Sequence, residues 1–404
     1  MKQMIKNILL PDSRIEWVKR IIGLAFLCQV FISTELWHGV ERLYPLIPAF
    51  GTEGMGWSAS MQKVLFYMLI MSSLSLVLIR NITWTVSSFL LILSLLFIED
   101  ITRVQAWSYQ YFLMLIIVLL DVFHKNRKAT ILALQWALIF IYFWAGIQKL
   151  NIHFELLVYP WLMTAYDFIE PLSKTTWLAY VVASFEILLG IGLFFEKTRK
   201  ITLILAILFH GFILFLLIGL EWNVIVYPWN IAMVGLLLVL FLDIKFFKHV
   251  PQISSKSMLT NLKWKALLPL VFIFFMLDVT PFLNQFGLWS DHLSLKMYTG
   301  DSVDARLHLS AKDASCVPEA LIDEMRIGEE TNEMLVSVDD WAFQELQVPS
   351  FGSDNGFKKA ALMYCNCAKD KSVTSIDIYH YQRWKKKKTV KRFTCQELYN
   401  DYKK

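Results

Sequence analysis

The sequence is poor in charged residues. Of its 404 residues only 18% are Asp, Glu, Lys or Arg, while 56% are hydrophobic, and the mean hydropathy is +0.48. Soluble domains carry nearer to about 25% charged residues, and uninterrupted apolar stretches of span length are typical of transmembrane helices. This composition excludes an ordinary soluble domain and predicts an integral membrane protein in contact with the lipid bilayer.

Several functional motifs are also missing. The sequence contains no dinucleotide-binding fingerprint, P-loop, zinc-protease motif or haem-attachment motif, and no nucleic-acid-binding motif. The net charge of +5 does not predict a nucleic-acid partner, because most basic residues flank apolar stretches. We expect no cleavable signal, since Arg14, Lys19 and Arg20 precede the first apolar stretch and no small-residue cleavage site follows it.

Nine apolar segments are candidates for membrane spans. Lys and Arg concentrate in alternate loops, for example in "HKNRK" (124–128), and this pattern predicts a cytoplasmic N-terminus over residues 1–20. It also predicts a transmembrane domain over 21–284, located in a plasma or inner membrane, and a C-terminus outside the cytoplasm. The predicted spans are about 21–37, 64–79, 82–98, 106–123, 129–149, 176–195, 201–219, 224–242 and 266–283.

The last part of the chain has a different pattern. From Trp289 onward charge is frequent, and no apolar run reaches span length. Short alternating segments predict β-strands: "SLKMYTG", "ARLHLS", "EMLVSV" and "SIDIYHYQRW". We therefore predict an extracytoplasmic β-rich domain over 285–404. Its basic run "RWKKKKTVKR" (383–392) is interpreted as a solvated hairpin end, with a lipid headgroup or acidic-partner contact as the alternative.

Cysteine is scarce and clustered. Four of the five cysteines lie in the C-terminal region, namely Cys316, Cys365, Cys367 and Cys395, whereas Cys28 is alone in the first span. Four cysteines in an oxidising compartment can form two disulfides, with three possible connectivities. Zinc is the alternative, but the spacing matches no common zinc motif, so we expect no metal.

Ionisable groups within the spans mark candidate functional residues. Lys149 ends the fifth span in "IYFWAGIQKL" (141–150), about 30 Å from its cytoplasmic end at roughly 1.5 Å per residue. There its ammonium can extend to the headgroups, or act as a general base if burial lowers its pKa. Glu186 and His210 lie near the middle of their spans, where such groups either join helices or mark function.

Other polar and aromatic residues share the outer level with Lys149. We expect them to line a polar cavity that opens to the outer face, with Lys149 and His210 as candidate catalytic residues. Aromatic side chains beside such a cavity suit a quinone or lipid ligand, although they also fit an interfacial aromatic belt. The predicted pocket residues are Glu35, His38, Asp100, Arg103, Trp107, Tyr109, Tyr142, Gln148, Glu186 and Asn230.

The segment "YFWAGIQKLN" (142–151) resembles the vitamin K-dependent gamma-carboxylase superfamily, including the bacterial HTTM-domain membrane proteins. Two further segments are similar to that family, "SYQYFLML" (108–115) and the pair Phe209–His210. The resemblance implies nine spans, an extracytoplasmic β-rich domain, and Lys149 as the base that deprotonates a reduced quinone. Trp107 departs from the family, whose carboxylases have a catalytic histidine there. Because an indole cannot exchange a proton as an imidazole does, we do not expect glutamate carboxylation.

Two functions are therefore predicted. The first is a quinone- or lipid-linked membrane enzyme, such as a quinone-dependent oxidoreductase or a lyase-like enzyme, that uses Lys149 as base. The alternative is a non-catalytic membrane module that presents an extracytoplasmic partner-binding domain. Transport ranks lower, since paired discontinuous helices are not evident in the two halves.

Overall fold

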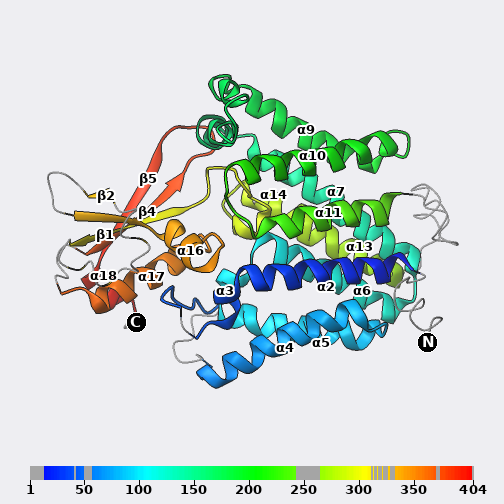
Figure 1. Cartoon of the computed structure of the whole chain (residues 1–404), viewed down its shortest axis with the longest axis horizontal. Helices are drawn as coiled ribbons and strands as arrows, with labels where there is room; N and C mark the ends of the chain where they lie inside the picture. The colour runs from blue at the N-terminus through cyan, green and yellow to red at the C-terminus, as the bar shows by residue number, and fades with distance from the viewer. Residues whose placement is uncertain are drawn as a thin grey trace.

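The computed structural model describes residues 13–40, 42–49, 57–242, 264–310, 313, 316, 321, 326–327, 333–369 and 374–402. Long helices run along one axis as a bundle, and a small sheet with its own helices lies at one end of that bundle (Figure 1). The long helices are α2 (Arg14–Ile32), α4 (Ala59–Leu78), α5 (Ile82–Glu99), α6 (Ala106–His124), α7 (Arg127–Lys149), α9 (Leu178–Phe194), α10 (Arg199–Gly219), α11 (Val226–Phe241) and the continuous segment α13 (Trp264–Phe274), η4 (Phe275–Val279) and α14 (Thr280–Asn284).

Short helices join the long ones. They are α3 (Thr34–His38), η1 (Ile101–Arg103), η2 (Phe154–Val158), α8 (Tyr159–Met163), η3 (Glu170–Lys174) and, after the bundle, η5 (His292–Ser294).

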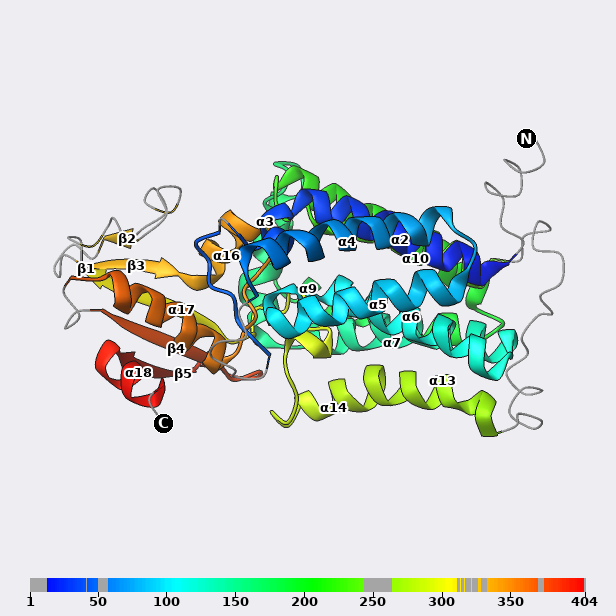
Figure 2. The ribbon, with the colours of Figure 1, turned by 90° about the horizontal axis from the view of Figure 1, so that it is seen from below.

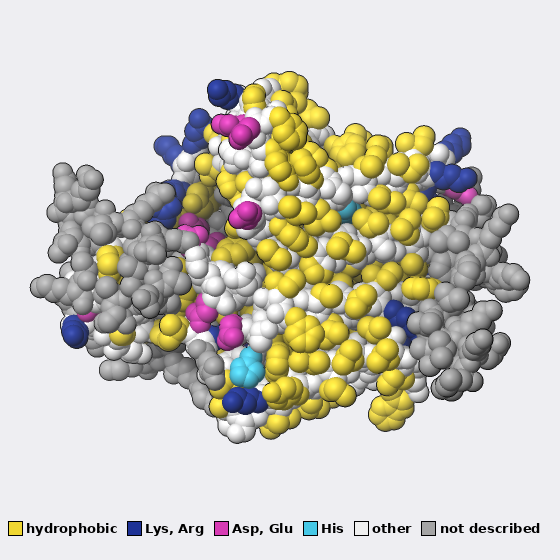
Figure 3. All heavy atoms as spheres, viewed as in Figure 1, with side chains coloured by type: hydrophobic (Ala, Val, Ile, Leu, Met, Phe, Trp, Pro, Cys, Tyr) yellow, Lys and Arg dark blue, Asp and Glu magenta, His cyan; other side chains and the backbone are white. Residues whose placement is uncertain are grey.

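The bundle has the surface of a membrane-embedded domain. Within the described ranges, six helices are long and apolar enough to cross a membrane, and the segments 154–163, 178–194 and 226–241 form shorter apolar helices. Apolar side chains cover the flank of the bundle, and basic side chains lie beyond both ends of this apolar surface (Figure 3). The prediction of a polytopic helical membrane protein with a small C-terminal sheet domain is confirmed, and each predicted span overlaps a helix.

The first helix begins at Arg14 rather than at residue 21 and ends at Ile32. Its basic residues lie against the ends of two neighbouring helices: Arg14 donates to the Val239 carbonyl of α11 at 2.8 Å, and Lys19 donates to the Ile79 carbonyl after α4. Carbonyl groups at helix C-termini carry partial negative charge and attract cations. Because of these contacts, Arg14 and Lys19 can lie inside the packed bundle. Hydropathy alone had placed both residues before the first span.

Glycines bring α7 and α9 into close contact. A side-chain carbon at Gly146 would lie 2.7 Å from the Ala183 carbonyl oxygen, and one at Gly190 would lie 2.9 Å from the Ile139 carbonyl oxygen. Small residues at such positions let two membrane helices approach along their backbones. This approach positions Lys149 of α7 beside Glu186 of α9.

The C-terminal region forms a five-stranded antiparallel sheet in the order β2-β3-β1-β4-β5. Ala305, Leu307 and Leu309 alternate as the buried residues of β1, and helices α16 and α17 pack beside the sheet (Figure 2). The elements are β1 (Asp304–Ser310), β2 (Arg326–Ile327), β3 (Glu333–Ser337), α16 (Val338–Leu346), α17 (Asp354–Cys367), β4 (Ser375–Tyr381), β5 (Lys388–Thr394) and α18 (Cys395–Tyr402).

Two details of the sheet differ from the sequence prediction. The segment 294–300 is a loop and not a strand, because Leu295 and Tyr298 adopt φ values of +60° and +54°, which break an extended conformation. The basic run 383–392 contains the β4–β5 hairpin turn, as interpreted, but it also continues into β5, whose last residue is Thr394. Exposed lysines are typical of an edge strand, where they discourage pairing with other chains.

The four C-terminal cysteines form two disulfides, Cys316–Cys367 and Cys365–Cys395. This is one of the three connectivities that the sequence left open. The pairs join the end of α17 to residue 316 and to the first residue of α18, so both clamp the same helix end. Cys28 is unpaired and exposed on α2.

Candidate functional site

The charged turn between α5 and α6 is held together by ion pairs. Arg103 lies 2.6 Å from Glu99, and Arg42 lies 2.6 Å from Asp100, measured between nitrogen and carboxylate oxygen. Burial alone would raise the pKa of Asp100, but the charges of Arg42 and Arg103 outweigh it and hold that pKa below its ordinary value. Each carboxylate thus has a cationic partner, which ties this turn to the loop that follows α3.

Lys149 is paired inside the bundle. Its Nζ lies 2.7 Å from Oε2 of Glu186 and also donates to the Ala145 carbonyl at 3.3 Å. The two residues are only 9% and 7% exposed, so the pair is shielded from solvent. A buried ammonium and carboxylate in contact stabilise each other, and removing either one leaves an uncompensated charge. In this position Lys149 joins α7 to α9.

His210 belongs to a buried hydrogen-bond chain across three helices. The amide of Asn230 donates to the Val226 carbonyl at 2.9 Å, which leaves its Oδ1 to accept from Nδ1 of His210 at 2.8 Å. The hydroxyl of Tyr142 then donates to Nε2 of His210 at 2.6 Å. Tyr142, His210 and Asn230 therefore satisfy one another and join α7, α10 and α11.

The remaining predicted pocket residues lie apart from these clusters. Glu35 is exposed on α3, His38 packs against Phe66 with ring centroids 5.3 Å apart, and Tyr109 is buried on α6. Gln148 donates to the Ser294 carbonyl at 3.3 Å. The structure thus distributes the predicted residues over separate packed clusters instead of one outer cavity, because the sheet domain and its linker pack onto the helix ends.

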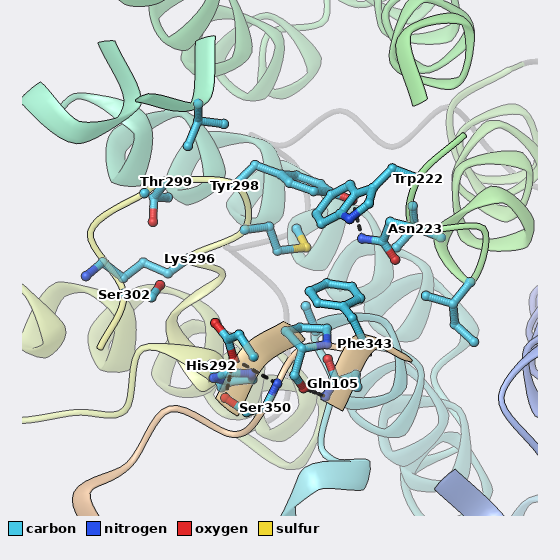
Figure 4. Close-up of a pocket in the computed structure, with 18 of the residues that line it drawn as sticks. Gln105, Trp222, Asn223, His292, Lys296, Tyr298, Thr299, Ser302, Phe343 and Ser350 are labelled. Atoms are coloured by element: carbon cyan, nitrogen blue, oxygen red, sulfur yellow. Dashed lines mark hydrogen bonds between the residues drawn. The ribbon is translucent and has the colours of Figure 1, made fainter. Parts of the chain in front are cut away.

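A cavity of about 790 Å³ lies instead at the junction between the helix ends and the sheet domain. Of the predicted pocket residues only Trp107 borders it. Figure 4 shows the rings of Trp222, Tyr298 and Phe343 together with Asn223, and His292 and Ser350 farther from them. Other lining residues include Gln105, Trp161, Glu221, Lys296, Thr299, Ser302, Asp304, Asp339, Asp340 and Tyr381.

One wall of this junction cavity is aromatic. The Trp222 ring lies 4.8 Å from Trp161, 5.6 Å from Tyr298 and 5.0 Å from Phe343, measured between centroids. Asn223 donates to the Tyr298 hydroxyl at 2.6 Å and fixes that ring. The wall combines side chains from the α10–α11 loop, the 295–303 loop and α16, so only the folded chain assembles it.

The cavity lining also carries several carboxyl groups. Asp304, Asp339 and Asp340 are among them, whereas Lys296 is already paired with Asp291 at 3.3 Å and Asp301 at 3.2 Å. Burial, and then the charge of Asp304, raise the pKa of Asp339 to about 7. Burial also raises the pKa of Asp304. Burial is the main cause of both shifts, and for Asp304 it outweighs the charges of Arg306 and Lys388, which act in the opposite direction.

Two polar atoms on the cavity lack a partner among the described residues, the Oγ1 of Thr299 and the Oδ1 of Asn223. Thr299 is only 1% exposed, and its side chain lies near Lys296 and Ser302 in Figure 4. Buried polar atoms in proteins usually have a hydrogen-bond partner. The hydroxyls of Tyr109 and Tyr111 inside the bundle also lack a partner among the described residues, so what distinguishes the junction is the cavity beside such atoms.

Specific contacts fix the sheet domain on the bundle and so shape the cavity. Glu345 of α16 accepts a hydrogen bond from the Tyr44 backbone at 2.7 Å, and Tyr44 packs against Trp341 with centroids 4.9 Å apart. Gln105 donates to the Pro349 carbonyl at 3.0 Å, and Asn151 donates to the Thr299 carbonyl at 3.1 Å. One sequence signal could have pointed to this site, namely the polar and aromatic residues Glu221, Trp222 and Asn223 directly after a predicted span.

Fold and site together define an integral membrane protein whose helical bundle carries a docked sheet domain with a cavity at the junction. A family model described as methylamine utilisation protein MauE, a membrane protein family, matches residues 127–226, which is 100 of the 404 residues. No curated protein and no solved structure matches the chain.

This match corrects the resemblance to HTTM-domain proteins of the gamma-carboxylase superfamily, which is wrong. The matched region includes Lys149 and the whole segment 142–151 on which that resemblance rested. An aromatic-rich helix ending in lysine is also what the membrane interface favours in unrelated proteins, because both residue types are suited to the headgroup level. The reduced quinone was inferred partly from the same resemblance, and it stays an untested prediction.

Proposed function

We propose that this chain is a non-catalytic membrane module that receives a segment of a partner protein in the junction cavity. The carrying observation is that cavity, whose walls come from both the bundle and the sheet domain and which is bordered by two polar atoms without a partner among the described residues, the Oγ1 of Thr299 and the Oδ1 of Asn223. The match of residues 127–226 to MauE supports an accessory role in the membrane. The bundle then serves to hold the sheet domain at the membrane surface.

The cavity lining supports a basic side chain as the inserted group. A lysine or arginine in a cavity lined by Asp304, Asp340 and Trp222 could form ion pairs with the carboxylates and a cation–π contact with the indole. The unpartnered Thr299 hydroxyl offers a further acceptor for an N–H group. A basic segment would also relieve the repulsion between Asp304 and Asp339.

The orientation belongs to the same proposal. The Lys and Arg distribution supports a sheet domain outside the cytoplasm. The disulfides Cys316–Cys367 and Cys365–Cys395 support the same side, because disulfides persist in oxidising compartments. The partner is therefore sought among extracytoplasmic proteins or domains.

Site-specific photo-crosslinking in the native host tests this proposal. A photoreactive phenylalanine analogue replaces Phe343 on the cavity wall, and a matched control places it at Met363, which is 40% exposed on α17. We expect a discrete crosslinked product from position 343 that disappears in an Asp304→Asn/Asp340→Asn background. Equal products from both positions, or a product unaffected by loss of the carboxylates, would contradict the proposal.

A second variant separates this function from an enzyme that uses Lys149. In Lys149→Met/Glu186→Leu both members of the ion pair are replaced by apolar groups of similar size. We expect this variant to fold and to give the same crosslinked product. Loss of the product in a folded variant would favour a functional role for Lys149.

A further inference from the structure

The turn of the β4–β5 hairpin is strongly basic and exposed. We define the basic tip as residues 384–388, which read Trp-Lys-Lys-Lys-Lys. All five side chains are exposed, and Trp384 is 64% exposed despite being a large indole. Lys388 lies over the Tyr379 ring at 3.8 Å. The ion pairs found in the described part of the chain involve none of these lysines.

Arg383, next to the tip, anchors the hairpin to the end of α7. Its Nε donates to the Leu150 carbonyl at 3.1 Å, and its guanidinium also binds the Ile147 carbonyl and the Gln285 side chain. The backbone adds a bond from the Ile152 amide to the Arg383 carbonyl at 3.2 Å. A guanidinium over the last carbonyls of a helix is favoured by the helix dipole. The hairpin is therefore fixed to the helix end and not merely near it.

This anchor determines the depth of the tip relative to the membrane. Helix α7 has 23 residues, which at about 1.5 Å per residue spans the hydrocarbon core of roughly 30 Å. Its last residues, Lys149 and Leu150, lie at the edge of that core, and the Arg383 side chain binds there. In Figure 3, basic side chains gather near the position of the β4–β5 turn in Figure 1, just beyond the apolar surface of the bundle.

We propose that the basic tip binds the headgroups of anionic phospholipids in the leaflet on the side of the sheet domain. Tryptophan is favoured at the headgroup level, and lysines close to the surface are attracted to anionic lipid. A lipid is the occupant rather than an acidic peptide, because the Arg383 anchor holds the tip at the boundary of the apolar surface. This inference is independent of the proposed partner cavity.

Native mass spectrometry of the full-length chain in a neutral detergent tests the proposal with phosphatidylglycerol and phosphatidylcholine as probes. The test variant is Lys386→Gln/Lys387→Gln. The control variant is Lys358→Gln/Lys369→Gln, which removes the same charge on and just after α17. Lys386, Lys387 and Lys369 are exposed, whereas Lys358 is partly exposed and pairs with Asp401 at 2.9 Å, so thermal unfolding of both variants is measured to establish that each is folded.

We expect the unmodified chain to bind phosphatidylglycerol at least tenfold more tightly than phosphatidylcholine. The tip variant should lose at least fivefold of this preference, since one lysine near an anionic surface contributes about a fivefold effect, whereas the control should keep it. Equal binding of the two lipids, or equal losses in both variants, would overturn the proposal. Inorganic phosphate or a poly-glutamate peptide that displaces phosphatidylglycerol at equal concentration would overturn it too, because the site would then recognise phosphate or acidic peptide.

Discussion

Polar residues inside the bundle and polar residues at the junction cavity are arranged differently. In the bundle, Lys149 has Glu186 and His210 has both Tyr142 and Asn230. At the junction, the buried Thr299 hydroxyl has no partner among the described residues, and the carboxyl groups of Asp304 and Asp339 both have raised pKa values.

This comparison distinguishes polar side chains that hold the helices together from polar side chains that could bind a ligand. In hydrocarbon a polar group must find a partner within the protein, so the bundle pairs its charged groups as it packs. At the junction, water can hydrate a group until a partner arrives. A buried ionisable residue in a span is thus weaker evidence of a site than an unpaired one beside a cavity.

The largest expected effect concerns the Lys149–Glu186 pair. Lys149→Met leaves the Glu186 carboxylate buried without its cation, which should destabilise the chain by about 3–5 kcal/mol. The double variant Lys149→Met/Glu186→Leu should recover most of that loss. A denaturant titration of the purified protein in mild detergent measures the free energy of unfolding of both variants. A single variant as stable as the original chain would show that the pair does not hold α7 to α9.

A smaller effect concerns pH and the junction. Since the pKa of Asp339 is raised to about 7, the folded chain binds this proton more tightly than the unfolded chain. Stability should therefore fall as pH rises from about 4 to about 7, and change no further above that. We expect the free energy of unfolding to fall by about 2 kcal/mol over this interval. One pKa unit corresponds to about 1.4 kcal/mol, and the value is set below the full shift because Asp339 borders an open cavity, where solvent screens its charge.

Thermal unfolding of the original chain and of Asp339→Asn at pH 5 and pH 7.5 measures this difference. The amide keeps the shape of the carboxyl group but does not titrate, so the variant should show a smaller change between the two pH values. An identical change in both proteins would assign the pH dependence to other groups.

The smallest effect compares two hydroxyl groups. Tyr142→Phe removes the donor to His210 and should cost about 0.6 kcal/mol and at most about 1.7 kcal/mol, the average and the maximum measured for hydrogen bonds between membrane helices. Thr299→Val removes an unpartnered hydroxyl and should be neutral or slightly stabilising. The same denaturant titration reports both variants. If Thr299→Val proves the more destabilising, the hydroxyl is already satisfied and the distinction between the two regions fails.

Periodicity and charge predicted the helices of the bundle well. The two places where the sequence prediction was wrong have a local structural reason. Hydropathy placed the later spans close to their helices, but it missed the early start of α2, where Arg14 and Lys19 bind carbonyls of other helices. Alternation found β1, β3 and β4. It also suggested a strand at 294–300, where Leu295 and Tyr298 have positive φ.

Composition and hydropathy were sufficient to establish a membrane protein with many spans and Lys149 at the end of its span, because the bilayer imposes long apolar helices with charges at their ends. Alternation of apolar and polar residues established the strands of the cysteine-bearing tail. Which of these residues lie next to each other was determined only by the tertiary structure. Glu186 meets Lys149 only because Gly146 and Gly190 let two helices approach, and Asp339 and Trp222 border one cavity only because the sheet domain docks on the helix ends. Contacts between residues far apart in sequence leave no periodic trace in either segment, so the chain had to fold before its cavity was defined.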